Sequence, residues 1–144
     1  MAGYKPGENV EAYQWLIDFY RRQTGRKIEV IFVRLPNDKY LHLDMAISFL
    51  RKGGVLVYPP ALHLAETWRS STLWGKRTVI ELAAKAEYFG ANIVEVGDTI
   101  ITTSVSEATQ QALEQLGYTI EMVDLSEFIK GGGGPHCLTL DLLD

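Results

Sequence analysis

The chain has 144 residues, 47% hydrophobic and 22% charged, which suits one soluble domain with a buried core. A formal net charge of -4 argues against a nucleic-acid surface and suits a cationic small molecule. No stretch approaches the roughly 18 apolar residues of a membrane span, the start lacks the apolar core of a signal peptide, and one cysteine excludes an internal disulfide. We therefore expect a cytoplasmic protein with a single domain over residues 1–144.

The first half of the chain predicts a helix followed by strands. In chain order the patterns favour a helix over 8–24, a strand over 27–35, a hairpin of strands over 40–50 and 55–58, and one or two helical turns over 61–68. Apolar residues recur at spacings of three and four in the helix, which Gly25 ends. Over 40–50 apolar and polar residues alternate, as expected for a strand with one buried face.

The second half mixes helices and strands. The patterns predict a helix over 78–89, strands over 91–96 and 99–103, a helix over 104–116, a strand over 118–123 and a short helical turn over 124–129. Ser104 and Glu107 have the spacing of a capping box at the start of the helix over 104–116. Ala108, Ala112, Leu113 and Leu116 form the expected buried face of this helix.

A repeat of elements accompanies this order. A helix, a strand and a hairpin-like strand recur near 8–58, 78–103 and 104–142. Each unit spans roughly 40–50 residues, which is within the range of repeated structural modules. The sequence therefore predicts an α/β fold that is built from about three similar modules.

The glycine run Gly131–Gly134 precedes Cys137, the only cysteine. Glycines without side chains allow a ligand to approach the main chain closely. Leu138, Leu140 and Leu142 alternate with other residues, which predicts a strand leaving the loop. A cysteine at the mouth of a strand suits a displayed nucleophile, whereas the alternative is a flexible loop followed by a small buried hydrophobic residue.

His42 and Asp44 are spaced by two, so a strand would present both side chains on one face. An imidazole beside a carboxylate suits a proton donor and acceptor, and the alternative is a polar face turned to solvent. Together with Cys137, His42 supplies the residue types of a thiol nucleophile and its general acid and base.

The motifs His42-Leu43-Asp44 and Gly133-Gly134-Pro135-His136-Cys137-Leu138-Thr139 closely resemble those of the guanidino-group-modifying superfamily. This superfamily includes arginine deiminases, dimethylarginine dimethylaminohydrolases and arginine:glycine amidinotransferases. The resemblance spans about residue 27 to the C-terminus and implies an α/β propeller of ββαβ-type modules. The chain would hold about three of the five modules, as the C-terminal part of the propeller.

The resemblance also implies roles for individual residues. Cys137 would attack the guanidinium carbon and form a thiouronium intermediate, and His42 would protonate the departing amine and then activate water or an amine. Asp44 would accept hydrogen bonds from the guanidinium nitrogens, beside a main chain that Gly133 and Gly134 leave open to substrate. No cofactor or metal is expected, and no role for His136 follows from the resemblance.

The chain departs from the superfamily pattern in its length. The modules before the His-x-Asp motif are absent, together with the further acidic residues that they carry. We therefore expect the site to be completed in a homo-oligomer or by a second chain, without nucleic acid or membrane. Hydrolysis of arginine or a related guanidino compound is the first expectation. The alternatives are an amidinotransferase and a non-catalytic subunit that retains the fold.

Overall fold

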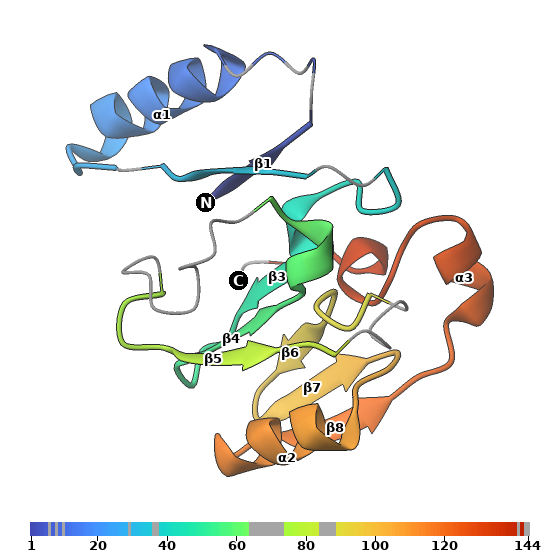
Figure 1. Ribbon diagram of the computed structural model, residues 1–144. Helices are drawn as coiled ribbons and strands as arrows, with labels where there is room; N and C mark the ends of the chain where they lie inside the picture. The colour runs from blue at the N-terminus through green and yellow to red at the C-terminus, as the bar shows by residue number, and fades with distance from the viewer. Residues whose placement is uncertain are drawn as a thin grey trace.

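The computed structural model describes residues 1–5, 7, 9, 11–28, 30–35, 38–63, 74–83, 89–140 and 142. In these residues the strands form three small sheets, which follow one another from the top to the bottom of the view in Figure 1. The strands are β1 (Ala2–Tyr4), β2 (Phe32–Arg34), β3 (Ile47–Phe49), β4 (Gly54–Val57), β5 (Thr78–Glu81), β6 (Val94–Val96), β7 (Thr99–Thr102) and β8 (Thr119–Met122). The α-helices are α1 (Glu11–Thr24), α2 (Glu107–Gln115) and α3 (Ser126–Lys130), and short 3₁₀ helices include η1 (Leu43–Met45), η2 (Pro59–Ala61) and η6 (His136–Leu138).

The first unit consists of α1 between the parallel strands β1 and β2. The helix predicted over 8–24 is confirmed from Glu11 onward, and Glu8 and Val10 lie outside the described residues. Ile17 is its buried side chain, and the Tyr13 hydroxyl donates to a carbonyl oxygen of β1 at 2.9 Å. The helix therefore packs on its own small sheet. In the described parts of the chain, no helix combines the length and the apolar character that crossing a membrane requires.

The second and third sheets share one topology. In each sheet an antiparallel pair, β3–β4 or β6–β7, is extended by a strand parallel to the second member, β5 or β8. In the third sheet α2 connects β7 to β8, which gives the order ββαβ. The predicted mixed α/β fold and its repeat are thus present, but the repeated strands span 47–81 and 94–122 rather than 78–103 and 104–142.

The prediction of a helix over 78–89 is wrong at its start, where the chain forms β5. Thr78, Val79 and Ile80 are β-branched and favour extended backbone. They pair in parallel with β4, all of whose residues are buried, and this long-range pairing outweighs the helical spacing. Residues 84–88, and residues 64–68 of the helical turns predicted over 61–68, lie outside the described residues.

After residue 90 the observed elements agree better with those predicted from the sequence. The predicted strands over 91–96, 99–103 and 118–123 and the turn over 124–129 correspond to β6, β7, β8 and α3. The helix predicted over 104–116 is α2, although its N-cap is Ser106 rather than Ser104. The Ser106 hydroxyl accepts the Thr109 N–H at 3.2 Å and satisfies a free donor of the first turn. Leu113 is buried as expected, whereas Ala108 is exposed.

The core centres on β4, where Val55, Leu56 and Val57 have no exposed surface. Gly54 begins this strand at a point with no room for a side chain, because a Cβ atom there would lie 2.7 Å from Cδ1 of Leu116. The close approach lets β4 pack against the end of α2. The second and third sheets therefore share one core.

A buried tyrosine joins the same two sheets. The Tyr118 hydroxyl donates to Oε1 of Glu95 at 2.5 Å and accepts the backbone N–H of Lys52 at 2.9 Å. The backbone N–H of Arg51 also donates to the Glu95 carboxylate, at 3.2 Å. Burial raises the pKa of Tyr118 above its ordinary value of 10.0, and the bond to the carboxylate raises this pKa further because a phenolate would face a like charge.

We expect Tyr118→Phe to lower the free energy of unfolding by about 1–2 kcal/mol near neutral pH, because the variant loses both hydrogen bonds. The raised pKa means that the folded state favours the protonated phenol. Its stabilisation is complete below pH 10 and is lost as the pH rises through the folded-state pKa. Urea unfolding at a series of pH values should therefore show the two proteins converging in alkali. A difference in stability that stays constant above pH 10 would contradict this assignment.

Candidate active site

His42 and Asp44 lie on a turn. The strand predicted over 40–50 is therefore wrong, except at Ile47–Phe49, which form β3. The Ala46 N–H donates to the Leu43 carbonyl at 2.9 Å and closes η1, and β3 begins only at Ile47. Alternation fails because the consecutive residues Ala46 and Ile47 are both buried in the core. The turn leaves His42 exposed and Asp44 half-buried at one edge of the second sheet.

Cys137 also lies on a turn, since the chain forms η6 where a strand was expected. Pro135 has a φ of -54°, which suits the start of a helical turn. The Thr139 hydroxyl donates to the Pro135 carbonyl at 3.1 Å and holds the turn closed. The alternating leucines that follow are exposed and pair with no strand in the described residues: Leu138, Leu140 and Leu142.

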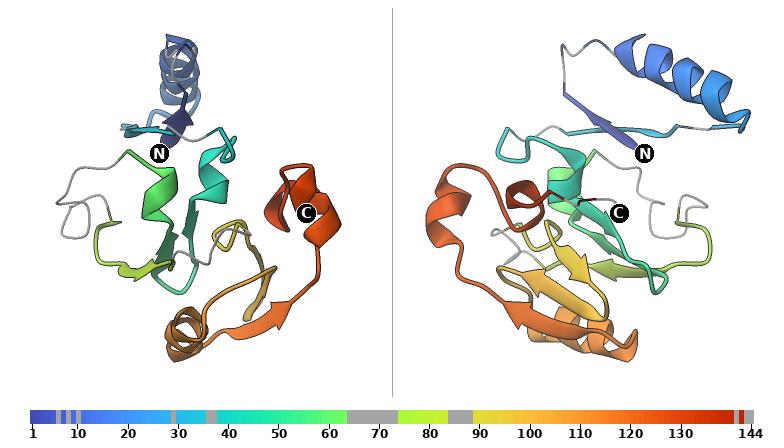
Figure 2. Two further views of the ribbon diagram at one scale, coloured as in Figure 1. Left: turned by 45° about the vertical axis from the view of Figure 1, so that its right-hand side comes forward. Right: turned by 180° about the vertical axis from the view of Figure 1, so that it is seen from behind.

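One cavity brings most of the predicted site residues together. Its volume is about 610 Å³, and His42, Asp44, Gly133 and Cys137 line it. The Cys137 thiol lies 3.6 Å from Oδ2 of Asp44, within reach of a weak S–H···O hydrogen bond. Gly134 is buried and is not one of the lining residues. Figures 1 and 2 show η1 beside the loop that carries η6, although the two are far apart in the sequence.

Asn92 connects the two turns of the cavity and has no exposed surface. Its Nδ2 donates to Oδ2 of Asp44 at 2.8 Å, and its Oδ1 accepts the backbone N–H of Cys137 at 3.2 Å. Asn92 was not among the site residues predicted from the sequence. The available signal was an amide within an otherwise apolar stretch, because a buried amide requires partners.

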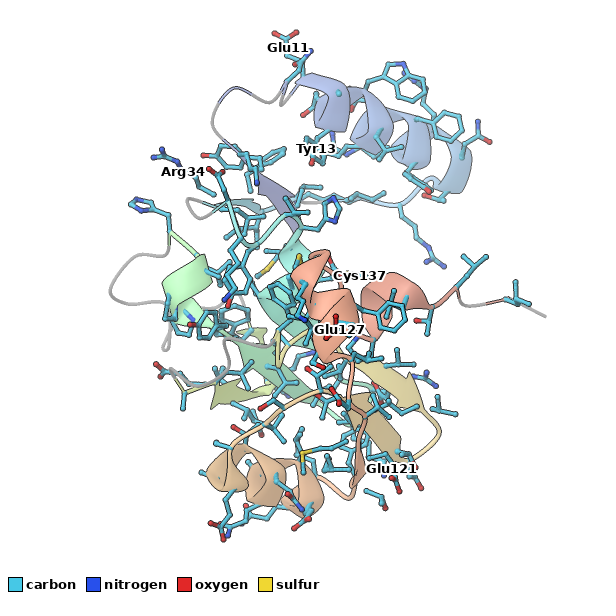
Figure 3. The ribbon with its side chains drawn as sticks, turned by 90° about the vertical axis from the view of Figure 1, so that its right-hand side faces the viewer. Glu11, Tyr13, Arg34, Glu121, Glu127 and Cys137 are labelled. Atoms are coloured by element: carbon cyan, nitrogen blue, oxygen red, sulfur yellow. The ribbon has the colours of Figure 1, made fainter. Side chains whose placement is uncertain are left out.

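Glu127 of α3 adds a second carboxylate to the cavity wall. It is paired with Lys130 at 2.6 Å, and Figure 3 shows it on the same side of the molecule as Cys137. Among the described residues that line the cavity, Asp44 and Glu127 are the carboxylates, and no lysine or arginine is present. A cavity with a thiol, an imidazole and two carboxylates is suited to bind a small cation and to attack it with sulfur.

Curated proteins resemble this chain over most of its length. It is 34% identical over 114 residues to ArgZ of Synechocystis sp., a bifunctional arginine dihydrolase/ornithine cyclodeaminase, and the match covers 78% of this chain and 16% of that protein. It is 31% identical over 115 residues to the N(G),N(G)-dimethylarginine dimethylaminohydrolase of Mycobacterium tuberculosis, covering 80% of this chain and 38% of that enzyme. No family model matches the chain.

Solved structures share the fold. The N-terminal domain of cyanobacterial ArgZ, a cysteine-to-serine variant bound to substrate, superimposes with a TM-score of 0.81 at 27% identity, over 96% of this chain and 49% of that one. The dimethylarginine dimethylaminohydrolase of Pseudomonas aeruginosa, complexed with citrulline, gives a TM-score of 0.69 at 25% identity, over 94% and 48%. This chain belongs to the guanidino-group-modifying superfamily. The resemblance inferred from the two motifs is thereby confirmed.

As a member of the guanidino-group-modifying superfamily, the chain is short. It spans less than two fifths of the curated relatives it matches and about half of the solved domains. The relatives' activities are those of longer proteins. The roles of Cys137, His42 and Asp44 in this superfamily member therefore stay predictions.

His136 is not among the residues that line the cavity of Cys137. It lines a second cavity of about 600 Å³, together with Arg51 of the β3–β4 turn and Glu95 of β6. The imidazole next to the thiol in sequence thus lines a different cavity from His42. Within the described residues, no three His, Cys, Asp or Glu side chains are grouped to hold a metal ion.

Proposed function

We propose that the protein containing this chain hydrolyses the guanidino group of arginine or a related compound through a covalent adduct at Cys137. The observation that carries the proposal is the shared cavity, in which the thiol lies 3.6 Å from the Asp44 carboxylate and His42 forms part of the wall. The relatives named above as arginine dihydrolase and dimethylaminohydrolase support this reaction class.

In the proposed reaction Asp44 accepts hydrogen bonds from the planar guanidinium, a cation rich in donors. The Cys137 thiol releases its proton to water beside the bound cation, and the resulting thiolate attacks the guanidinium carbon and forms a C–S bond. The amine then leaves with a proton from His42, and a thiouronium remains on the enzyme. His42 next takes a proton from water, which attacks the same carbon, and the C–S bond breaks to return the thiol.

The cavity wall explains why a cation is the proposed substrate. Asp44 contributes negative charge, which favours a cationic guanidinium over a neutral urea, whereas the charge of Glu127 is already paired with Lys130. Gly133 lines the cavity without a side chain, so a planar group can approach the main chain beside Cys137. The product of hydrolysis is neutral at this carbon and would be held less tightly.

The topology supports a proposal about the assembly. The sheets β3–β4–β5 and β6–β7–β8 repeat one strand order, so we propose that they and the first unit are three modules of an α/β propeller. The further modules and acids of the superfamily pattern would complete the site from outside these 144 residues, within the same protein, in a homo-oligomer or from a second polypeptide. The hydrolase is favoured over an amidinotransferase because the named relatives are hydrolases.

The test uses the complete protein that contains this chain. Incubation with arginine or with dimethylarginine should release citrulline together with ammonia or dimethylamine, and a second hydrolysis of citrulline would release ornithine. A cationic haloacetamidine should form an adduct that mass spectrometry places at Cys137. An adduct without turnover would identify a non-catalytic subunit, and neither adduct nor turnover would refute the proposed function.

A further inference from the structure

Asn92 is a buried side chain whose hydrogen bonds reach both turns of the cavity. It is 48 residues from Asp44 and 45 residues from Cys137 in sequence. Asn92 lies just before β6, the first strand of the third sheet. Asp44 precedes β3 of the second sheet, and Cys137 follows β8, the last of the strands. A single buried amide thus ties together three segments of the chain.

The orientation of this amide is fixed by its partners. The Cys137 N–H can only donate, so it must meet Oδ1, and a carboxylate can only accept, so Asp44 must meet Nδ2. Nδ2 also lies 3.5 Å from the Asp44 carbonyl oxygen. Aspartate would lose the donor, and leucine would lose both bonds.

The glycine loop encloses the amide from another side. A Cβ atom at Gly134 would lie 2.7 Å from Oδ1 of Asn92 and 3.1 Å from its Cβ. Gly134 is therefore required by packing on Asn92, which explains why it is buried rather than exposed in the cavity. The amide has little room to turn away from its two partners.

We propose that Asn92 is a positioning residue that holds the Asp44 carboxylate and the Cys137 thiol at the separation needed for attack on a bound cation. The inference rests on the proposed function. A cation paired with Asp44 meets the sulfur only if the two turns keep their relative position, and Asn92 provides the buried polar connection between them.

The test compares two alkylating reagents on the complete protein. The cationic 2-chloroacetamidine should be guided by Asp44, whereas neutral iodoacetamide reports only the accessibility and reactivity of the thiol. We expect Asn92→Ala and Asn92→Asp to lower the ratio of the two labelling rates at Cys137 about tenfold or more, because a charge-assisted hydrogen bond is lost. Thr102→Val is the matched control: Thr102 is fully buried with no hydrogen-bond partner for Oγ1 among the described residues, and the ratio should stay within about twofold of wild type.

The outcomes separate the two proposals. If the wild-type protein shows no preference for the amidine, the proposed function fails. If wild type shows the preference and folded Asn92 variants retain it, the positioning role fails. Should both variants misfold, hydrogen exchange of the wild-type Cys137 amide decides: the bond to Asn92 predicts protection of at least about tenfold on an exposed residue, and exchange at the unprotected rate would overturn the inference.

Discussion

Replacement of Cys137 by serine is expected to lower kcat for a guanidino substrate by about a thousandfold or more. A serine hydroxyl is a far weaker nucleophile than a thiol, and the proposed reaction has no other group to form the covalent intermediate. Because these 144 residues contain one cysteine, haloacetamidine labelling within them should disappear. Steady-state kinetics and intact-protein mass spectrometry measure the two effects.

His136→Asn is the control for this experiment. His136 is the immediate neighbour of the thiol on η6, yet it lines the second cavity, so its replacement should leave kcat within about threefold of wild type. A serine variant that kept a tenth or more of the wild-type turnover would remove Cys137 from the mechanism. Equal losses in the two variants would point to damage of the turn rather than loss of the nucleophile.

Asp44→Asn is expected to raise KM for arginine about 10- to 100-fold, equivalent to roughly 1.5–3 kcal/mol of charge-assisted hydrogen bonding. The substitution removes the charge that we propose pairs with the guanidinium. It preserves an oxygen that can accept the Asn92 Nδ2–H, so the turn should keep its shape. KM from initial rates, with thermal unfolding as a check on folding, measures the effect.

The matched control is Asp98→Asn, which also removes one negative charge. Asp98 lies in the β6–β7 turn, is exposed, and pairs with Lys52 at 2.7 Å. Exposed ion pairs contribute little, so KM should change by less than about twofold. If both asparagine variants raised KM equally, general attraction of the cation by the acidic protein, rather than Asp44, would account for binding.

Local signals explain which elements the sequence predicted well. The β3–β4 hairpin turns at Lys52-Gly53-Gly54, and the β6–β7 hairpin turns at Gly97-Asp98, so both depend on residues close in sequence. The segment that became β5 was misjudged because its partner, β4, lies about twenty residues earlier and its pairing leaves no local trace. Periodicity alone favoured a helix there.

The site shows the same division between local and long-range information. Residue types identified His42, Asp44 and Cys137 as candidates even though both strands predicted to carry them are 3₁₀ turns at those points. Asn92 was missed because its hydrogen bonds reach two distant turns, and Glu127 because only the folded chain brings it to the cavity wall. Such contacts exist only after the sheets have packed.

The carboxylate of Asp44 and the thiol of Cys137 meet although the two residues are 93 positions apart in the sequence. During synthesis the acidic turn leaves the ribosome before the sulfur, which emerges only after the strands of all three sheets. Unfinished polypeptides thus contain the acid but not the sulfur. The pair of side chains is therefore formed only once the chain has folded.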